Sequence, residues 1–386
     1  MKKPFLLIAL MGLMYQACSN STIEGENEIE TMMKSDFSSI LDLPSISYNY
    51  ANPSLPSHFR DNDLQNIDNT PSNNLITDAG ATLGRVLFYD KNLSANNTIA
   101  CASCHLQANG FADPNRFSTG FLGGTTGRNS MSLANAKYYD NGRFFWDERA
   151  ESLEEQVLMP IQDEVEMGLS LAALVDKLQA LDYYSPLFQS AFGSSEITED
   201  RISKSLSQFV RSMVSYQAKF DVGAAQARSI ENDNFSNFSQ IENQGKQLFF
   251  SGRTQCSNCH ETVSFSGDQA RNNGLDTFTT DAGTGGITGR NQDLGKFKVN
   301  SLRNIAITAP YMHDGRFSSL REVIQFYNNG IQDHPNLDNR LTQRNGQPIR
   351  MNLNNQEIDA IVAFLNTLTD QQFVTDVKFS SPFVDR

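Results

Sequence analysis

Two short motifs of cysteine and histidine are the residues of this chain with the most specific chemistry. Both follow the pattern C-x-x-C-H, and they occupy residues 101–105 and 256–260. In this pattern two thiols add to the vinyl groups of a c-type haem, and the adjacent histidine binds the iron from one side. The sequence therefore predicts two covalent haem groups, with attachment residues Cys101, Cys104, His105, Cys256, Cys259 and His260.

The alternative interpretation of these motifs is a pair of redox-active or zinc-binding C-x-x-C sites. It would leave both following histidines unexplained in a chain that has only five histidines. The motifs use four of the five cysteines, so a framework of disulfides is excluded.

Length and charge narrow the class of protein further. The chain has 386 residues, which is enough for two domains, and one haem motif lies in each half. The formal net charge of -13 argues against nucleic acid as a partner, because nucleic acid is bound by clustered Lys and Arg. A basic protein partner is compatible with this charge, and so is a plain acidic surface.

The amino terminus has the pattern of an export signal. Two lysines precede an apolar run from Phe5 to Met14, which is too short to serve as a membrane span. Ala17 and Cys18 resemble a bacterial lipoprotein processing site, so residues 1–18 are predicted to be a lipoprotein-type signal with a lipid anchor on Cys18. The alternative is cleavage near the same point and release. Both outcomes place the chain in the periplasm, where c-type haem is attached.

The remaining chain is expected to be all-α, because no segment shows sustained period-two alternation. Residues 19–75 are polar and are predicted to be a tether and lead-in, followed by a first haem domain at 76–230 and a second at 231–386. Helices are expected from Thr77, at 152–159, 170–181 and 198–220, and after the capping boxes at Ser239, Ser319 and Asn354, with a loop at 266–296. The predicted fold is two cytochrome c-like helical domains that pack about an interface and bind one haem each.

Several further segments resemble the bacterial di-haem cytochrome c peroxidase family, which includes MauG-like enzymes. The resemblance extends over residues 76–370. It rests on the haem motifs together with residues 145–156, 160–161, 165–168, 302–304 and 309–315. It implies that the first haem reacts with hydrogen peroxide and that the second passes electrons.

The resemblance also implies roles for residues around the first haem. Glu166 and Gln156 match the family's distal pair, which moves a proton between the peroxide oxygens and orients the peroxide. Pro160 is expected in the same pocket. Trp146, the only tryptophan, matches a residue between the two haems that helps electrons cross, although a core aromatic would explain it equally well.

One departure from the family's pattern concerns the loop at residues 118–129. Peroxidases that need reductive activation carry a blocking histidine there, whereas this loop has none. We therefore expect the first haem to be open in the resting ferric state. His58 is the alternative ligand, and otherwise it is expected to be a surface residue of the lead-in.

The sixth ligand of the second haem is left open by the sequence. The resemblance places Tyr327 at the position usually held by Met, and MauG has Tyr there. Tyr327 shares a helical face with apolar residues, so it is expected to point inward. Met312 and Met351 are the competing candidates.

The remaining expectations concern a cation and two histidines. The resemblance implies a Ca²⁺ ion between the domains, bound by the Asn129 side chain and by the carbonyl groups of Thr308 and Pro310. His313 is expected to be structural or to contact a haem propionate. His334, which precedes a proline, is expected to be exposed.

The leading functional hypothesis is a periplasm-facing di-haem peroxidase that reduces hydrogen peroxide to water. Its electrons would come from a small cytochrome c or cupredoxin, and related enzymes are often homodimers. The alternatives are a MauG-like oxidase that acts on a protein or organic substrate, and a non-catalytic di-haem electron carrier.

Overall fold

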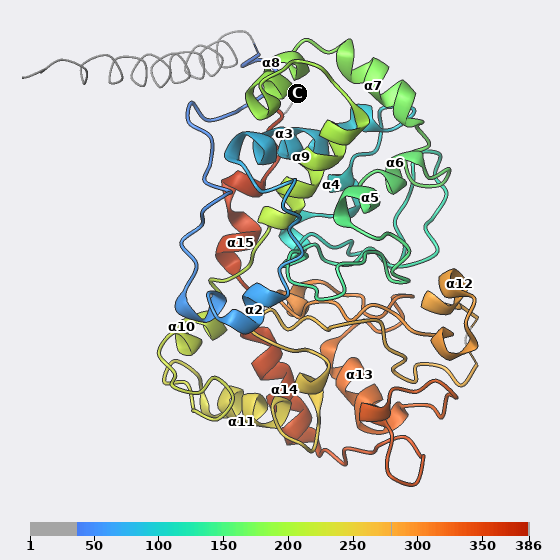
Figure 1. The fold of residues 1–386 in the computed structure, drawn as a ribbon. Coiled ribbons are helices and arrows are strands. Elements are labelled where there is room, and N and C mark those ends of the chain that lie inside the picture. Colours follow the sequence, from blue (N-terminus) through green and yellow to red (C-terminus); the bar gives the residue numbers. More distant parts are fainter. Residues whose placement is uncertain (1–36, 279, 385–386) are drawn as a thin grey trace, which may run out of the picture.

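The computed structural model describes residues 37–278 and 280–384, in which helices and long loops are accompanied only by isolated β-bridges (Figure 1). This confirms the all-α prediction. The predicted signal, the polar residues 19–36 and the anchor at Cys18 lie outside the described residues. No helix in the described part of the chain is long and apolar enough to cross a membrane.

The helices form two lobes, one above the other in Figure 1. The upper lobe contains α3 (Asp78–Tyr89), α4 (Cys101–Cys104), α5 (Leu153–Gln156), α6 (Met159–Gln162), α7 (Leu171–Gln179), α8 (Tyr184–Phe192), α9 (Glu199–Ser212) and α15 (Gln371–Thr375). The lower lobe contains α2 (Asn62–Asn66), α10 (Lys219–Ala224), α11 (Gln240–Phe249), α12 (Thr284–Thr288), α13 (Leu320–Gln325) and α14 (Asn355–Asn366).

Shorter helical turns connect these elements. They are 3-10 turns at Ser57–Phe59, Lys91–Leu93, Gln107–Asn109, Cys256–Asn258, Asn291–Asp293, Ile305–Ile307, Asn339–Leu341 and Val377–Phe379. A π-helical turn at Phe326–Gly330 continues α13.

The two lobes repeat one arrangement of helices around their haem motifs. In the upper lobe α3 packs against α9, and in the lower lobe α11 packs against α14. Each crossing has a glycine at its closest point. A Cβ atom on Gly84 would lie 2.0 Å from the Ser205 carbonyl oxygen, and one on Gly245 would lie 1.8 Å from that of Ala360. Only glycine allows the helices to approach this closely.

Side-chain caps begin most of the predicted helices at the expected residues. Thr77 accepts a hydrogen bond from the backbone N–H of Gly80 at the start of α3. The capping boxes at Ser239, Ser319 and Asn354 are all formed, and they begin α11, α13 and α14. These caps satisfy backbone donors that a helix start leaves unpaired.

The single helix predicted over residues 198–220 is wrong, because the chain breaks between α9 and α10. The Ser215 N–H donates to Asn135 Oδ1 over 2.7 Å, and the Tyr216 and Gln217 N–H groups donate to Asp370 Oδ2 over 3.0 and 2.8 Å. Side chains distant in sequence thus replace the carbonyl partners that a continuous helix would supply. A short helix, α12, also lies within the segment expected to be loop.

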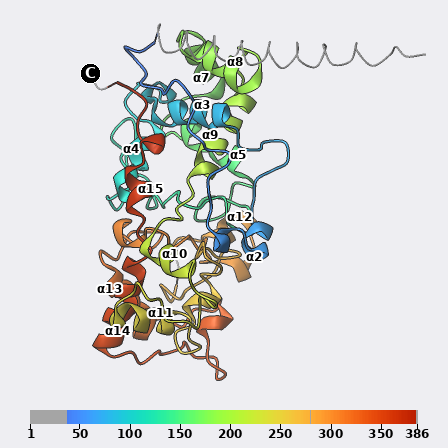
Figure 2. The ribbon, with the colours of Figure 1, turned by 90° about the vertical axis from the view of Figure 1, so that its left-hand side faces the viewer.

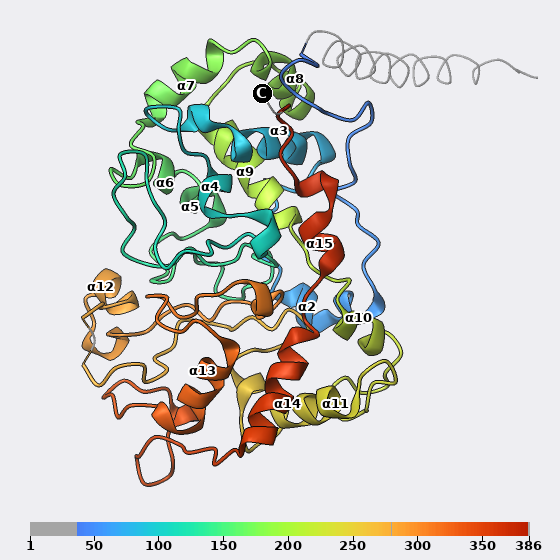
Figure 3. The same cartoon turned by 180° about the vertical axis from the view of Figure 1, so that it is seen from behind.

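Both ends of the described chain cross from one lobe to the other, as Figures 2 and 3 show. In the lead-in, Tyr50 is buried in the upper core, whereas Phe59 and Leu64 are buried in the lower core. At the other end, Phe373 and Phe379 follow the lower lobe in sequence but pack in the upper core. The lobes are therefore joined by the lead-in, which returns to the upper lobe at α3, by the connection between α9 and α10, and by that between α14 and α15.

Candidate active site

Each histidine that is predicted to bind a haem is oriented by a backbone carbonyl group. His105 Nδ1 lies 2.9 Å from the Phe111 carbonyl oxygen, and His260 Nδ1 lies 3.1 Å from that of Phe265. A carbonyl oxygen only accepts, so each Nδ1 carries the proton and each Nε2 keeps a lone pair for a metal. Both phenylalanines have positive φ angles of 60° and 52°, which turns their carbonyl groups toward the rings.

The four motif cysteines are unpaired thiols in largely buried surroundings. Burial raises the pKa of Cys101 to about 12 and the pKa values of Cys104, Cys256 and Cys259 to about 11. Redox-active C-x-x-C sites have the opposite property, a lowered thiol pKa. With the oriented histidines, these thiols fit covalent haem attachment.

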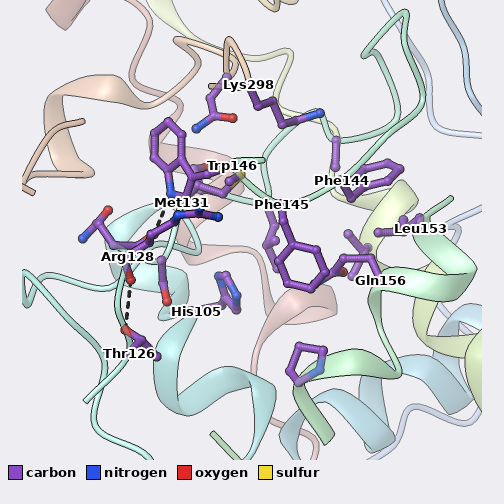
Figure 4. A pocket seen from close by; sticks show the side chains of 18 of the residues that line it. His105, Thr126, Arg128, Met131, Phe144, Phe145, Trp146, Leu153, Gln156 and Lys298 are labelled. Carbon is purple, nitrogen blue, oxygen red and sulfur yellow. Dashed lines mark hydrogen bonds between the residues drawn. The ribbon is translucent and has the colours of Figure 1, made fainter. Parts of the chain in front are cut away.

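A cavity of about 350 Å³ opens beside His105 in the upper lobe (Figure 4). The residues predicted for the peroxide site line it together: Gln156, Pro160, Glu166 and Trp146. The structure therefore brings the predicted set to one place. Among the described residues that line the cavity, His105 is the only histidine.

Glu166 lines this cavity and binds its proton more tightly than an exposed glutamate does. Burial, together with the negative charge of Asp163, raises the pKa of Glu166 to about 7, and Arg149 opposes the shift. A carboxyl group with such a pKa can both take up and release a proton near neutral pH. Gln156, the last residue of α5, supplies an uncharged amide to the same cavity.

The loop after the first haem motif is docked on the Glu166 backbone. The Phe121 N–H donates to the Glu166 carbonyl oxygen over 3.0 Å, and Asn96 Nδ2 donates to the Phe121 carbonyl oxygen over 2.7 Å. Gly120 is required there, because a Cβ atom would lie 1.6 Å from the Val165 carbonyl oxygen. The loop is held as a wall beside Glu166.

His58 does not line either haem cavity, and its expected exposure is wrong. It is buried, and its Nε2 lies 2.9 Å from Asp221 Oδ1 in the lower lobe. Asp221 Oδ2 also accepts from Arg303 over 2.7 Å. His58 therefore belongs to a buried ion-pair cluster that fixes the lead-in on the lower lobe.

Trp146 lies between the two haem sites. It lines the cavity of His105 and also a second cavity, of about 240 Å³, that contains His260. Its Nε1 donates to the Asn129 carbonyl oxygen over 2.8 Å, and its own carbonyl oxygen accepts from the Lys298 N–H over 2.8 Å. The indole is thus held by Asn129, and the backbone of Trp146 is held by Lys298 of the second half of the chain.

All three candidates for the sixth ligand of the second haem line the second cavity. Tyr327, on the π-helical turn, accepts a hydrogen bond from Asn273 Nδ2 over 3.2 Å. The same nitrogen lies 3.6 Å from Met312 Sδ, and Met351 is buried in the wall. A π-helical turn widens a helix and is frequent at functional sites. Tyr327 and Met312 therefore lie beside one another, on the same side-chain nitrogen of Asn273.

The three residues implied for calcium also line the second cavity. Asn129 Nδ2 donates to the carbonyl oxygens of Asn115 and Arg116 over 3.0 and 3.3 Å, which directs Oδ1 away from them. The peptide bond between Ala309 and Pro310 is cis, and Thr308 directly precedes it. A side-chain oxygen and two carbonyl groups are a donor set that suits a hard cation.

The two remaining histidines are both buried. The His313 ring stacks on the Phe297 ring with centroids 3.7 Å apart, and its centroid lies 6.4 Å from that of the Trp146 ring. His334 is 7% exposed and its Nδ1 accepts from the Asn336 N–H over 2.9 Å, so its expected exposure is wrong. The ring thereby closes on the backbone of the turn that follows it.

Sequence reasoning missed a group of polar residues on the wall of the first cavity. Tyr139 and Lys298 line it, and Glu148 is buried behind Tyr139. No motif marks this group, since Lys298 comes from the other half of the chain. The one local signal is a glutamate two residues after Trp146.

Comparisons with known proteins agree with this geometry. A family model described as di-haem cytochrome c peroxidase matches residues 78–228, and a cytochrome c model matches residues 243–369. The chain is 33% identical to the methylamine utilization protein MauG of Methylorubrum extorquens, over 77% of this chain and 80% of that protein. It is 31% identical to the cytochrome c551 peroxidase of Nitrosomonas europaea, over 76% and 80%.

A crystal structure of a MauG-like protein associated with microbial copper homeostasis has the same fold, with a TM-score of 0.71. It is 31% identical, and the match covers 87% of this chain and 99% of that one. The chain therefore belongs to the di-haem cytochrome c peroxidase family. It is an oxidoreductase that binds two c-type haems.

Proposed function

We propose that this enzyme reduces hydrogen peroxide to water at the His105 site, with electrons relayed from the His260 site. The observation that carries the proposal is Glu166, with a pKa of about 7, in one cavity with Gln156 and His105. When bound, the first haem supplies the iron through which electrons reach peroxide.

The side chains of the cavity account for the proton transfers. Ionised Glu166 takes the proton from one peroxide oxygen and returns it to the other, so that the O–O bond breaks with water as the leaving group. Gln156 orients the peroxide through its amide without adding charge. Two electrons and two protons from outside complete the reduction of each peroxide to two waters.

Electrons are proposed to cross between the haem sites through Trp146, which lines both cavities. The proposed donor is a small cytochrome c or cupredoxin, since the net charge of -13 would speed the approach of a basic partner. A periplasmic location, an anchor on Cys18 and a homodimer belong to the same proposal, and they rest on the sequence and on the family.

We also propose a Ca²⁺ ion held by Asn129 Oδ1 and the carbonyl oxygens of Thr308 and Pro310. Its support is that all three residues line one cavity and that the Asn129 carbonyl oxygen binds Trp146. Such an ion would fix the position of the indole between the lobes.

A second candidate function is a MauG-like oxidase that spends the oxidising equivalents on a protein or organic substrate. The loop without histidine favours this function, and so does Tyr327 in the second cavity. Tyrosinate lowers the potential of a ferric haem, which stabilises oxidised states.

Steady-state turnover distinguishes the two functions. With hydrogen peroxide and a reduced small cytochrome c, the peroxidase oxidises the cytochrome continuously in proportion to the peroxide consumed. An enzyme that reacts with peroxide but leaves several reduced cytochromes and cupredoxins untouched would contradict the peroxidase proposal and support the oxidase.

The role of Glu166 is tested by a matched pair of variants. Glu166→Gln removes the titrating group and should slow the reaction with peroxide about 10²–10⁴-fold. Glu164→Gln removes the same charge from an exposed neighbour and should leave the rate unchanged. Equal effects of the two substitutions would contradict the proposal.

A further inference from the structure

A buried pair, Tyr139 and Glu148, lies against the peroxide cavity and has no part in the proton transfers above. The Tyr139 hydroxyl donates a hydrogen bond to Glu148 Oε1, and Glu148 Oε2 accepts from Asn141 Nδ2 over 2.8 Å. The two residues are only 2% and 4% exposed. A carboxylate is rarely buried unless it is paired in this way.

The backbone holds Glu148 in an unusual conformation to make this contact. Its φ angle is 56°, in the left-handed region that residues other than glycine and asparagine seldom adopt. Its N–H donates to the Phe145 carbonyl oxygen over 3.3 Å, and its carbonyl oxygen accepts from Arg143 Nη1 over 3.4 Å. Strain of this kind is concentrated at functional sites.

The pair lies between the cavity and the exposed residue Asn141. Tyr139 lines the cavity together with Trp146 and Phe144, and this is the cavity in which peroxide is proposed to be reduced. On the other side, the carboxylate is bonded to Asn141, which is exposed. A proton that leaves Tyr139 therefore has a buried base, Glu148, within hydrogen-bond contact.

The electrostatics suit loss of an electron from this phenol together with its proton. Burial and the Glu148 charge raise the pKa of Tyr139 well above its usual value, so the reduced side chain keeps its proton. Oxidation makes a phenol strongly acidic, and a hydrogen-bonded carboxylate then accepts the proton. The proton and the electron therefore leave together.

Lys298 covers the other side of the ring without opposing this step. Its Nζ lies 2.8 Å from the Tyr139 ring centroid, near Phe144 (Figure 4), and donates to the Arg143 carbonyl oxygen over 2.9 Å. An ammonium ion there would hold electrons on the ring. Burial lowers the pKa of Lys298 well below its usual value, although Glu148 opposes the shift, which favours the neutral amine.

We propose that Tyr139 is a redox-active residue that gives one electron to the peroxide-oxidised first haem site and its phenolic proton to Glu148. The O–H bond of Tyr139 breaks, an O–H bond forms on the carboxylate, and a neutral tyrosyl radical remains. The oxidant comes from peroxide, so the inference rests on the proposed function. One electron from a donor and the proton from Glu148 restore the pair.

The test is rapid freeze-quench EPR of the ferric, haem-loaded protein mixed with hydrogen peroxide and no reductant. A tyrosyl radical signal is expected, and it should narrow in protein that contains ring-deuterated tyrosine. Tyr139→Phe should abolish the signal. Tyr138→Phe is the matched control, because Tyr138 is equally buried but packs in the lower core instead of the cavity wall.

Glu148→Gln keeps a hydrogen-bond acceptor but cannot take up the proton, so the radical yield should fall. A wild-type radical signal in Tyr139→Phe, or a full yield in Glu148→Gln, would overturn the inference. So would haem absorption that changes with peroxide while no tyrosyl signal appears. Haem absorption that does not change at all would overturn the proposed function as well.

Discussion

At the scale of single residues, burial shifts the pKa values of His105 and Glu166 in opposite directions. Burial keeps the pKa of His105 below its usual value, although the hydrogen bond to the Phe111 carbonyl group opposes the shift, so its Nε2 is free to bind a metal. Burial acts on Glu166 in the other direction and raises its pKa to about 7. In both cases removal from water disfavours the charged form.

The raised pKa of Glu166 predicts the pH dependence of the reaction with peroxide. The ionised carboxylate is the form that accepts a proton, so the rate constant should rise with pH and reach half its maximum near pH 7. Stopped-flow measurements between about pH 5 and 9 on wild type and Glu166→Gln check this, and the variant should lack the inflection. An unchanged inflection in the variant would assign it to another group.

The ligand of the second haem is tested by three single substitutions. Tyr327→Phe removes the hydroxyl group and should change the absorption and EPR spectra of the second haem, whereas Met312→Leu and Met351→Leu should not. All three side chains line the cavity, so each substitution is a control for the others. Unaltered spectra in Tyr327→Phe, with a change in one Met variant, would make that Met the ligand.

At this scale the sequence could predict which residues gather around each haem, because their spacing and the family pattern fix them. It could not predict the burial of His58 and His334, since their partners Asp221 and Asn272 are distant in the chain. It also could not predict the Tyr139–Glu148 pair, which depends on a positive φ angle at Glu148.

At the scale of elements, each lobe depends on one close helix crossing. The α3–α9 and α11–α14 contacts pass over Gly84 and Gly245, where a Cβ atom would meet a carbonyl group of the facing helix. These helices position the segments that carry the two haem motifs. The first half matches a di-haem cytochrome c peroxidase model and the second half a cytochrome c model.

Gly245→Ala should therefore destabilise the lower lobe by about 1–3 kcal/mol, because the helices must separate to accommodate the added methyl group. This overrides the gain that alanine usually brings to a helix interior. Gly252→Ala is the control, since its Cβ atom meets nothing within 4 Å. Denaturant unfolding followed by the absorption of the second haem measures the difference, and equal midpoints for the two variants would contradict the prediction.

The sequence predicted where most of these helices begin, because a cap is a local pattern of two residues. It did not predict where α9 ends. The break depends on Asp370 and Asn135, which take the backbone donors of residues 215–217 from outside the helix. No local pattern in those residues reveals such partners.

At the scale of the whole molecule, residues at the end of the chain pack in the core of the first lobe. Phe379 lies at the end of the predicted second domain, yet it packs against Phe111 and Phe209 in the upper core. Phe111 supplies the carbonyl group that orients His105. The tail of the chain therefore supports the first haem site, and the sequence could not show this, because an apolar residue does not specify which core it joins.

Phe379→Ala should cost about 3–5 kcal/mol of stability and should alter the spectrum of the first haem more than that of the second. Phe379 is 2% exposed, whereas Val377 in the same turn is 60% exposed, so Val377→Ala is the matched control. Thermal unfolding and EPR of both variants provide the comparison. A loss confined to the second haem would contradict the assignment of the tail to the upper lobe.

The central claim is that the cavity beside His105 is open to peroxide in the resting oxidised protein. Rapid-mixing absorption spectroscopy of the fully ferric protein with one equivalent of hydrogen peroxide and no reductant tests it most directly. We predict a fast change in the haem spectrum, because the loop at residues 118–129 has no histidine to block the site. A spectrum that stays unchanged until the protein is first reduced would contradict the claim.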